Sequence, residues 1–211
     1  MTRLLSRTGG WLRSHRLVRA GLSGLTGLLL LAAIGLIGFP FFTDLYQSQV
    51  VEGHLAHELR SPRLKSQYVH RDIHQGESLT RIRIPSIGVD TIVVQGTSEG
   101  ALQAGAGHYP STPLPCMVGN VAIAGHRTTY GHPFTNLNLL VPGDLIELQT
   151  PIGSCTYRVS RPPFSVLPTD TAVADNTPGR YTITLTTCTP EGWATHRLVV
   201  KGVMVSRSLK G

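Results

Sequence analysis

The sequence is poor in charged residues. Asp, Glu, Lys and Arg make up 15% of its 211 residues, against roughly 25% in typical soluble proteins. Because 41% of the residues are hydrophobic, the composition excludes a disordered chain, which combines low hydrophobicity with high charge. The 23 glycines and 14 prolines follow no repeat, which excludes collagen-like and low-complexity chains. The length fits one ordinary domain with an appendage.

Acidic residues are missing from the start of the chain. Residues 1–20 carry five arginines and no acid, and residues 21–42 carry no charge. As a helix, the second stretch would span about 33 Å, enough for a hydrocarbon core of ~30 Å. The run is longer than the apolar part of a cleaved signal peptide, and Pro40–Thr43 is too bulky for a cleavage site. We therefore predict an uncleaved signal-anchor over residues 21–42, with a cleaved signal peptide as the alternative.

The basic residues are distributed unevenly. A formal net charge of +7 invites a nucleic-acid hypothesis, since clustered Lys and Arg are typical of phosphate binding. Five of these charges precede the apolar run, which leaves 14 basic against 12 acidic residues beyond it. The excess is therefore an orientation signal that holds the N-terminus in the cytoplasm. We expect a single-pass cell-membrane protein, with no nucleic-acid partner and with the rest of the chain outside.

Cysteine is scarce, with three residues, so the thiols cannot all pair within the chain. His54/His57 and His70/His74 have helical spacings, but no Cys or carboxylate partners are arranged around them. We therefore expect no metal site and no cofactor.

Beyond the apolar run, the pattern predicts a short helix followed by many strands. Asp44–Leu59 has apolar residues at roughly helical spacing and predicts a juxtamembrane helix. We expect Pro62 to end it and the stretch to Ser78 to be a linker rather than core. Short β-type runs follow, bounded by turn residues. The expected strands are 81–84, 91–94, 120–124, 145–149, 155–159, 181–186 and 198–205. Seven or eight such strands predict a closed barrel or a sandwich.

Two segments carry reactive side chains where expected strands end. In residues 122–131 an apolar strand leads to His126 in a glycine-flanked loop, and in residues 184–190 a β-rich run ends in Cys188. Arg197 opens another strand nine positions later. An imidazole can help a thiol to become the attacking thiolate, and a guanidinium, which stays protonated, can stabilise an oxyanion.

Thr184–Cys188, which reads Thr-Leu-Thr-Thr-Cys, resembles the TLxTC motif of sortases, the membrane-anchored cysteine transpeptidases of Gram-positive bacteria. Gly125–Arg127 is similar to their histidine loop, and Arg197 stands where their arginine follows the cysteine. The resemblance extends from about Leu79 to Val205. The extended histidine loop resembles class E, the housekeeping type of many actinobacteria.

The resemblance implies a fold and a division of the chain. The fold is all-β, a closed eight-stranded β-barrel with short helices, over residues 79–207. A basic tail (1–20), the anchor (21–42) and a juxtamembrane segment (43–78) would precede this catalytic domain.

The resemblance also implies a reaction. Cys188 would attack the Thr–Gly bond of an LAxTG- or LPxTG-type sorting signal and form a thioester, which a cell-wall amine then releases. His126 is implied as the acid and base, and Arg197 would position the signal and stabilise the oxyanion. The implied partners are secreted proteins with a C-terminal sorting signal, and lipid II or another wall amine.

Three residues are candidates for substrate contact. In class E relatives the loop tyrosine, here Tyr130, is linked to a preference for Ala in the signal, which favours LAxTG. Thr129 lies in the same loop and Thr187 precedes Cys188. For Thr187, a structural role in the strand is the alternative.

Two residues depart from the family's pattern. His132 stands where a small residue is expected, and Cys116 where relatives often carry Gly. An extracytoplasmic setting permits a disulfide between Cys116 and Cys155. The spacing does not show that their Cα atoms come within ~7 Å, so paired and free thiols both stay open.

Three other functions stay open as well. A pilin-polymerising sortase would use a Lys in place of the wall amine. An L,D-transpeptidase also has ordered His, Cys and Arg, but its His lies much closer to the Cys than the 62 positions between His126 and Cys188. The third is a non-catalytic anchored β-domain that binds cell-wall partners.

Overall fold

The N-terminal part of the chain is a long apolar helix. A computed structural model describes residues 16–46 and 51–209, and the chain divides into two units, Met1–Phe42 and Thr43–Gly211. Helix α2 (Arg16–Tyr46) contains Ala20–Phe39, the one segment of the described residues that is long and apolar enough to cross a membrane. Its central leucines are more than half exposed, unlike those of a core helix. This helix is therefore a candidate membrane anchor.

Two short helices precede the strands. Residues 47–50, part of the juxtamembrane helix that we predicted, lie outside the described residues, and α3 covers Glu52–Glu58. The expected linker after Pro62 is instead helix α4 (Pro62–His70), with Ser61 as its N-cap. Pro is compatible with the first helical turn, because the N–H that it lacks has no partner there. Proline thus begins this helix rather than only ending the one before it.

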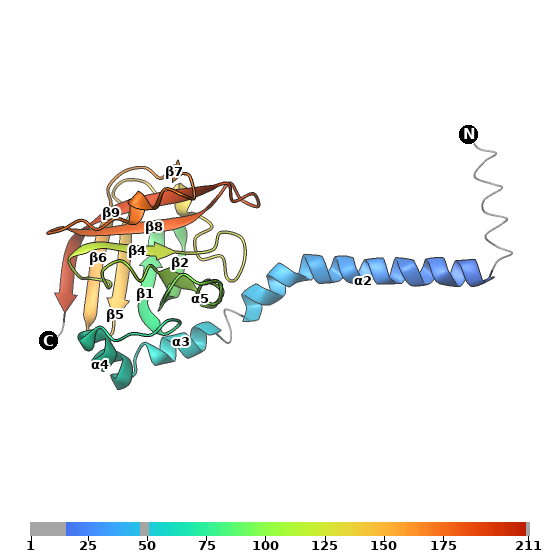
Figure 1. Cartoon of the computed structure of the whole chain (residues 1–211), viewed down its shortest axis with the longest axis horizontal. Helices are drawn as coiled ribbons and strands as arrows, with labels where there is room; N and C mark the ends of the chain where they lie inside the picture. Colours follow the sequence, from blue (N-terminus) through green and yellow to red (C-terminus); the bar gives the residue numbers. More distant parts are fainter. Residues whose placement is uncertain (1–15, 47–50, 210–211) are drawn as a thin grey trace. The chain divides into compact units, whose positions relative to one another are not determined.

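The strands of the described residues form one sheet that closes on itself. The hydrogen-bonded order is β6-β5-β1-β2-β3-β4-β8-β9, and β6 also pairs with β9. This ring is the predicted closed eight-stranded barrel, and β7 lies outside it, paired with β9. Figure 1 shows β1, β5 and β6 side by side. The bounds are β1 Ser78–Ile84, β2 Val89–Gln95, β3 Ala106–His108, β4 Gly119–Ala124, β5 Leu145–Thr150, β6 Gly153–Val159, β7 Phe164–Val166, β8 Tyr181–Thr189 and β9 His196–Leu209.

Alternating side chains fill the barrel. In β1, Ile82 and Ile84 are fully buried while Arg83 is exposed, because successive side chains in a strand point to opposite faces. Ile123 of β4 and Ile183 of β8 belong to the same core cluster. Each such buried side chain contributes roughly 1.5–3 kcal/mol, so burial of the inward faces of the strands supplies the main driving force for the barrel.

The remaining elements are short. Helix α5 (Glu99–Ala104) begins after the N-cap Ser98 and precedes β3. Three 3-10 turns lie in the loops of the described residues. They are η2 Pro85–Ile87, η3 Leu137–Leu139 and η4 Thr171–Ala174.

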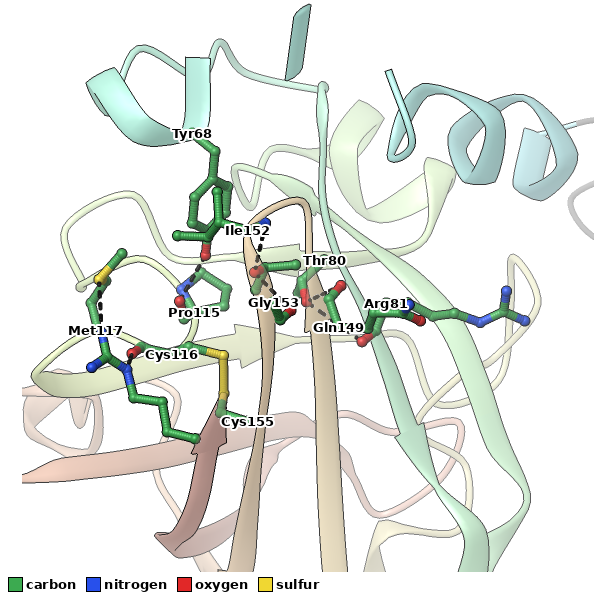
Figure 2. The surroundings of a disulfide bond; sticks show 12 residues. Tyr68, Thr80, Arg81, Pro115, Cys116, Met117, Gln149, Ile152, Gly153 and Cys155 are labelled. Carbon is green, nitrogen blue, oxygen red and sulfur yellow. Dashed lines mark hydrogen bonds between the residues drawn. A yellow bond between two sulfur atoms is a disulfide. The ribbon is translucent and has the colours of Figure 1, made fainter. Parts of the chain in front are cut away.

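A disulfide joins the β3–β4 loop to the barrel wall. Cys116 and Cys155 are bonded, with their Cα atoms 5.6 Å apart, and Figure 2 shows the bond beside the hydroxyl of Tyr68. This hydroxyl donates a hydrogen bond of 2.7 Å to the carbonyl of Pro115. Cys116 has φ +65°, a left-handed conformation that favours glycine, which explains why the family's pattern has Gly there. Helix α4, the loop and β6 are thus joined at one place.

Candidate active site

The histidine follows β4, and the cysteine lies near the end of β8, the parallel strand that pairs with β4. β4 and β8 pair with a constant offset of 62 residues, as for Ala124 opposite Thr186. His126 and Cys188 are separated by the same 62 positions. The pairing therefore brings both residues to the same level, just beyond the end of β4.

Two hydrogen bonds continue the pairing past the strand end. The Gly125 N–H donates to the Thr186 carbonyl at 3.1 Å, and the Thr187 hydroxyl donates to the Gly125 carbonyl at 2.8 Å. Thr187 is 3% exposed, so its hydroxyl is used inside the protein. Of the three predicted substrate contacts, Thr187 is the one that the structure buries. Its hydroxyl holds the backbone of Gly125, the residue before His126.

Arg197 reaches Cys188 from the next strand. β8 and β9 are antiparallel, and Cys188 lies directly opposite Arg197. The Arg197 Nη1 atom is 3.3 Å from the Cys188 Sγ atom. Both side chains are partly exposed, so a guanidinium and an accessible thiol stand together at the rim of the barrel.

His126 is half-buried and its ring is close to an aromatic side chain. The ring centroids of His126 and Tyr130 are 5.4 Å apart, and the His126 Nε2 atom is buried with no hydrogen-bond partner among the described protein atoms. Burial lowers the pKa of His126, and the carboxylate of Glu99 opposes that shift. A lowered pKa favours the neutral imidazole near pH 7, which can accept a proton.

The histidine loop contains two non-glycine residues in left-handed conformations. Tyr130 has φ +53° and His132 has φ +31°, a region that favours glycine. The preference of the family's pattern for a small residue at position 132 therefore has a backbone cause. Thr129 is partly exposed, and its carbonyl accepts a hydrogen bond of 3.0 Å from the His132 N–H.

A cavity of about 370 Å³ lies on the Arg197 side of the site. Its lining includes Thr186, Tyr109 and Asn176, and the Tyr109 hydroxyl is 3.1 Å from the Thr186 hydroxyl. Tyr109, directly after β3, was not among the site residues predicted from the sequence. Its position became evident only when β3 was placed beside β4.

The wall of this cavity is held by buried polar groups. The segment Pro168–Asn176 contributes most of the lining. The Asn120 amide donates to the Asp175 carbonyl at 3.0 Å, and the Lys201 ammonium donates to the Val173 carbonyl. Burial lowers the pKa of Lys201. These bonds join the loop between β7 and β8 to the outer face of the barrel.

Among the described residues, no three His, Cys, Asp or Glu side chains gather closely enough to hold a metal ion.

A closed β-barrel that carries a thiol, a guanidinium and an imidazole at one rim defines a β-barrel protein with a candidate cysteine active site. Comparison with known proteins gives its family. The family model described as the sortase domain matches residues 82–205. The chain belongs to the sortase family.

Two curated relatives show similarity over part of their length. Sortase SrtE1 of Streptomyces coelicolor is 36% identical over 145 residues, which cover 62% of this chain and 41% of the relative. Sortase D of Bacillus subtilis is 29% identical over 134 residues, covering 62% of this chain and 66% of the relative. The chain thus matches less than two thirds of the length of each relative.

Solved structures agree with the fold. Sortase E from Streptomyces avermitilis is 34% identical with a TM-score of 0.59, and the match covers 64% of this chain and 93% of that chain. A Clostridium perfringens sortase D5 transpeptidase is 28% identical with a TM-score of 0.65, covering 74% and 99%.

Proposed function

We propose that this protein is a cysteine transpeptidase that cleaves a C-terminal sorting signal between Thr and Gly and joins the protein to a cell-wall amine. The observation that carries the proposal is the 3.3 Å contact of Arg197 with the Cys188 thiol, at the level where His126 leaves the neighbouring strand. A sortase C of Clostridium perfringens with a similar fold (26% identity, TM-score 0.59) was solved with the C-terminal cell wall sorting motif.

The first half of the reaction forms a thioester. The imidazole of His126 first accepts the proton of the Cys188 thiol. The resulting thiolate attacks the Thr carbonyl carbon, and Arg197 stabilises the negative charge that develops on the carbonyl oxygen. His126 in its protonated form then gives a proton to the Gly nitrogen as the C–N bond breaks. The acyl group stays on the sulfur, and the Gly-containing fragment leaves as an amine.

The second half transfers the acyl group. The incoming amine loses a proton to the neutral imidazole of His126 and attacks the thioester carbonyl carbon. The C–S bond breaks, an amide forms and the thiolate returns. Because activity needs Cys188 and His126 in one productive protonation pair, kcat/KM should follow a bell-shaped pH profile. A rate that stays flat from about pH 5 to pH 10 would contradict this coupling.

The cavity beside Arg197 is the proposed place for the signal. Tyr109 and Thr186 lie on its lining, and Tyr130 packs near His126. We expect an LAxTG-type signal, with Tyr130 and Thr129 in contact with it and Thr187 in a supporting role. Lipid II is the proposed source of the amine.

Residues 21–42, which lie within helix α2, are the proposed membrane anchor. With the arginines of residues 1–20 in the cytoplasm, residues 43–78 and the catalytic domain of residues 79–207 would lie outside the membrane, where the sorting signal and the wall precursor meet.

The test is a mass-spectrometric assay of the full chain in detergent micelles. Peptides containing LAxTG or LPxTG are incubated with Gly, Lys or diaminopimelate amines, and the product masses distinguish transfer from hydrolysis. Cys188→Ala should abolish both products. Binding of the peptides without any cleavage by the wild-type protein would refute the proposal and support a non-catalytic binding domain, whereas exclusive use of Lys would indicate pilin polymerisation.

A further inference from the structure

Arg127 is a buried guanidinium next to His126. It is 8% exposed, and its Nη1 atom donates to the Thr189 hydroxyl at 2.9 Å and to the Cys188 carbonyl at 3.4 Å. Its Nη2 atom donates to the Asn138 side chain at 2.9 Å, and its Nε atom donates to the Thr135 carbonyl at 3.3 Å. One side chain thus contacts the end of β8 and two later positions of the histidine loop, Thr135 and Asn138.

A buried charge is stable only when it is paired and hydrogen-bonded. The four hydrogen bonds of Arg127, together with Glu191 at 3.2 Å, supply the partners that its fixed fork of donors requires. In return, the Thr135 hydroxyl donates to the Arg127 carbonyl at 2.7 Å. The segment around Arg127 is therefore held from both its side chain and its backbone.

These contacts lie where the strand pairing has ended. The β4–β8 ladder stops at Ala124 opposite Thr186, two residues before His126 and Cys188. Beyond the hydrogen bond of the Thr187 hydroxyl to Gly125, Arg127 connects the histidine loop to the end of β8 through its hydrogen bonds to Cys188 and Thr189. Arg127 lines neither the cavity beside Arg197 nor the one that borders Tyr130.

We propose that Arg127 is a positioning residue, which holds His126 against Cys188 by tying the histidine loop to the end of β8, and which does not contact the substrate. The role in turnover rests on the proposed transpeptidase function. The role in loop geometry does not, and it is measurable without any substrate.

The chemistry of the fork makes the role specific to Arg. A Lys side chain keeps the charge, but its compact ammonium cannot reach acceptors on three separate segments at once. A misplacement of about 1 Å in a reacting group can reduce the rate on the order of 100-fold. Arg127→Gln should therefore lower kcat about 100-fold with KM changed by less than about 3-fold, and Arg127→Lys should recover only part of the loss.

The experiment combines kinetics with hydrogen exchange on the full chain in micelles. In Arg127→Gln, amide exchange should accelerate in peptides covering 125–138 and 187–192 and stay unchanged in β1, β5 and β6. The exposed Arg158→Gln on β6 is the matched control and should leave both readouts unchanged. Asn138→Ala removes one acceptor at an exposed position. If Arg127→Gln fails to fold, Asn138→Ala takes its place and should give a smaller change of the same kind.

Each outcome decides the proposal. Faster exchange in both segments with a lower kcat supports it. Unchanged exchange overturns it, and so does a raised KM with an unchanged kcat, because that result would indicate direct substrate contact. If the wild-type chain cleaves no peptide, the transpeptidase proposal fails, and the exchange data alone then support or overturn the positioning of the loop.

Discussion

Opening the Cys116–Cys155 disulfide should lower the free energy of unfolding of the barrel by about 4 kcal/mol. The two cysteines are 39 positions apart, and a crosslink of that length removes loop-closure entropy from the unfolded chain. Both side chains are almost fully buried, with 0% and 2% exposed. The loss should come mainly from the greater freedom of the unfolded state, which the crosslink restricts.

The assay uses residues 43–211 with Cys188→Ala, so that the disulfide holds the remaining two cysteines. Thiol titration should find no free thiol before reduction and two after reduction in denaturant. For a domain of this size, about 4 kcal/mol corresponds to a fall in Tm of roughly 8–16 °C. Urea unfolding of the oxidised and reduced forms gives the free energies directly.

A double variant, Cys116→Ala with Cys155→Ala, is the control for the reductant itself and should melt at the same temperature with and without it. Reduced and oxidised forms of the parent that unfold within about 2 °C of each other would refute the reasoning, because the crosslink would then leave the unfolded ensemble nearly unchanged.

Three further changes have outcomes fixed by the structure. Burial lowers the pKa of His108 to about 4, while the unfolded chain takes up this proton near pH 6.5, so stability should fall by about 3 kcal/mol as the pH drops from 6.5 to 4. His108→Gln should flatten this slope in urea unfolding at each pH, and an unchanged slope would contradict it. Tyr68→Phe leaves the Pro115 carbonyl without its donor and should cost about 1–3 kcal/mol, a loss that equal urea midpoints would rule out. Gly125→Ala places a Cβ atom 2.6 Å from the buried ring of Phe134. It should cost about 1–3 kcal/mol and reduce peptide cleavage, and a variant as stable and active as wild type would show that the ring has room to move.

Much of the barrel was predictable because its long strands carry their own signal. The alternation in Arg81–Ile84 and Tyr181–Leu185 marks the two faces of β1 and β8 directly. β3 and β7 have three residues each, which is too short for a period-2 pattern. Helix α4 was missed because Pro62 stands at its start and its buried face consists of only Leu64 and Tyr68.

The sequence motifs selected the residues of the candidate site but not the contacts that support them. The motifs selected His126, Cys188 and Arg197, and the β8–β9 pairing brings the last two into contact. The spacing of 62 positions between His126 and Cys188 is explained by the pairing of β4 with β8, which has the same offset. Arg127 belongs to the Gly125–Arg127 segment that resembles the family's histidine loop. Its own role was not predicted, because its acceptors are mostly backbone carbonyls and neutral side chains from other segments.

The position of β9 has a consequence for how the molecule matures. β9 pairs with β6, β7 and β8, so closure of the ring and delivery of Arg197 to Cys188 depend on the same strand. The pairing of β9 with β6, such as Gly153 opposite Leu209, is non-local, and such pairings form slowly, whereas β8 and β9 form a hairpin in which Arg197 lies opposite Cys188. In a chain that crosses a membrane from its N-terminus, Cys188 would therefore emerge before Arg197. The site would be complete only when residues 196–209 have followed and closed the barrel.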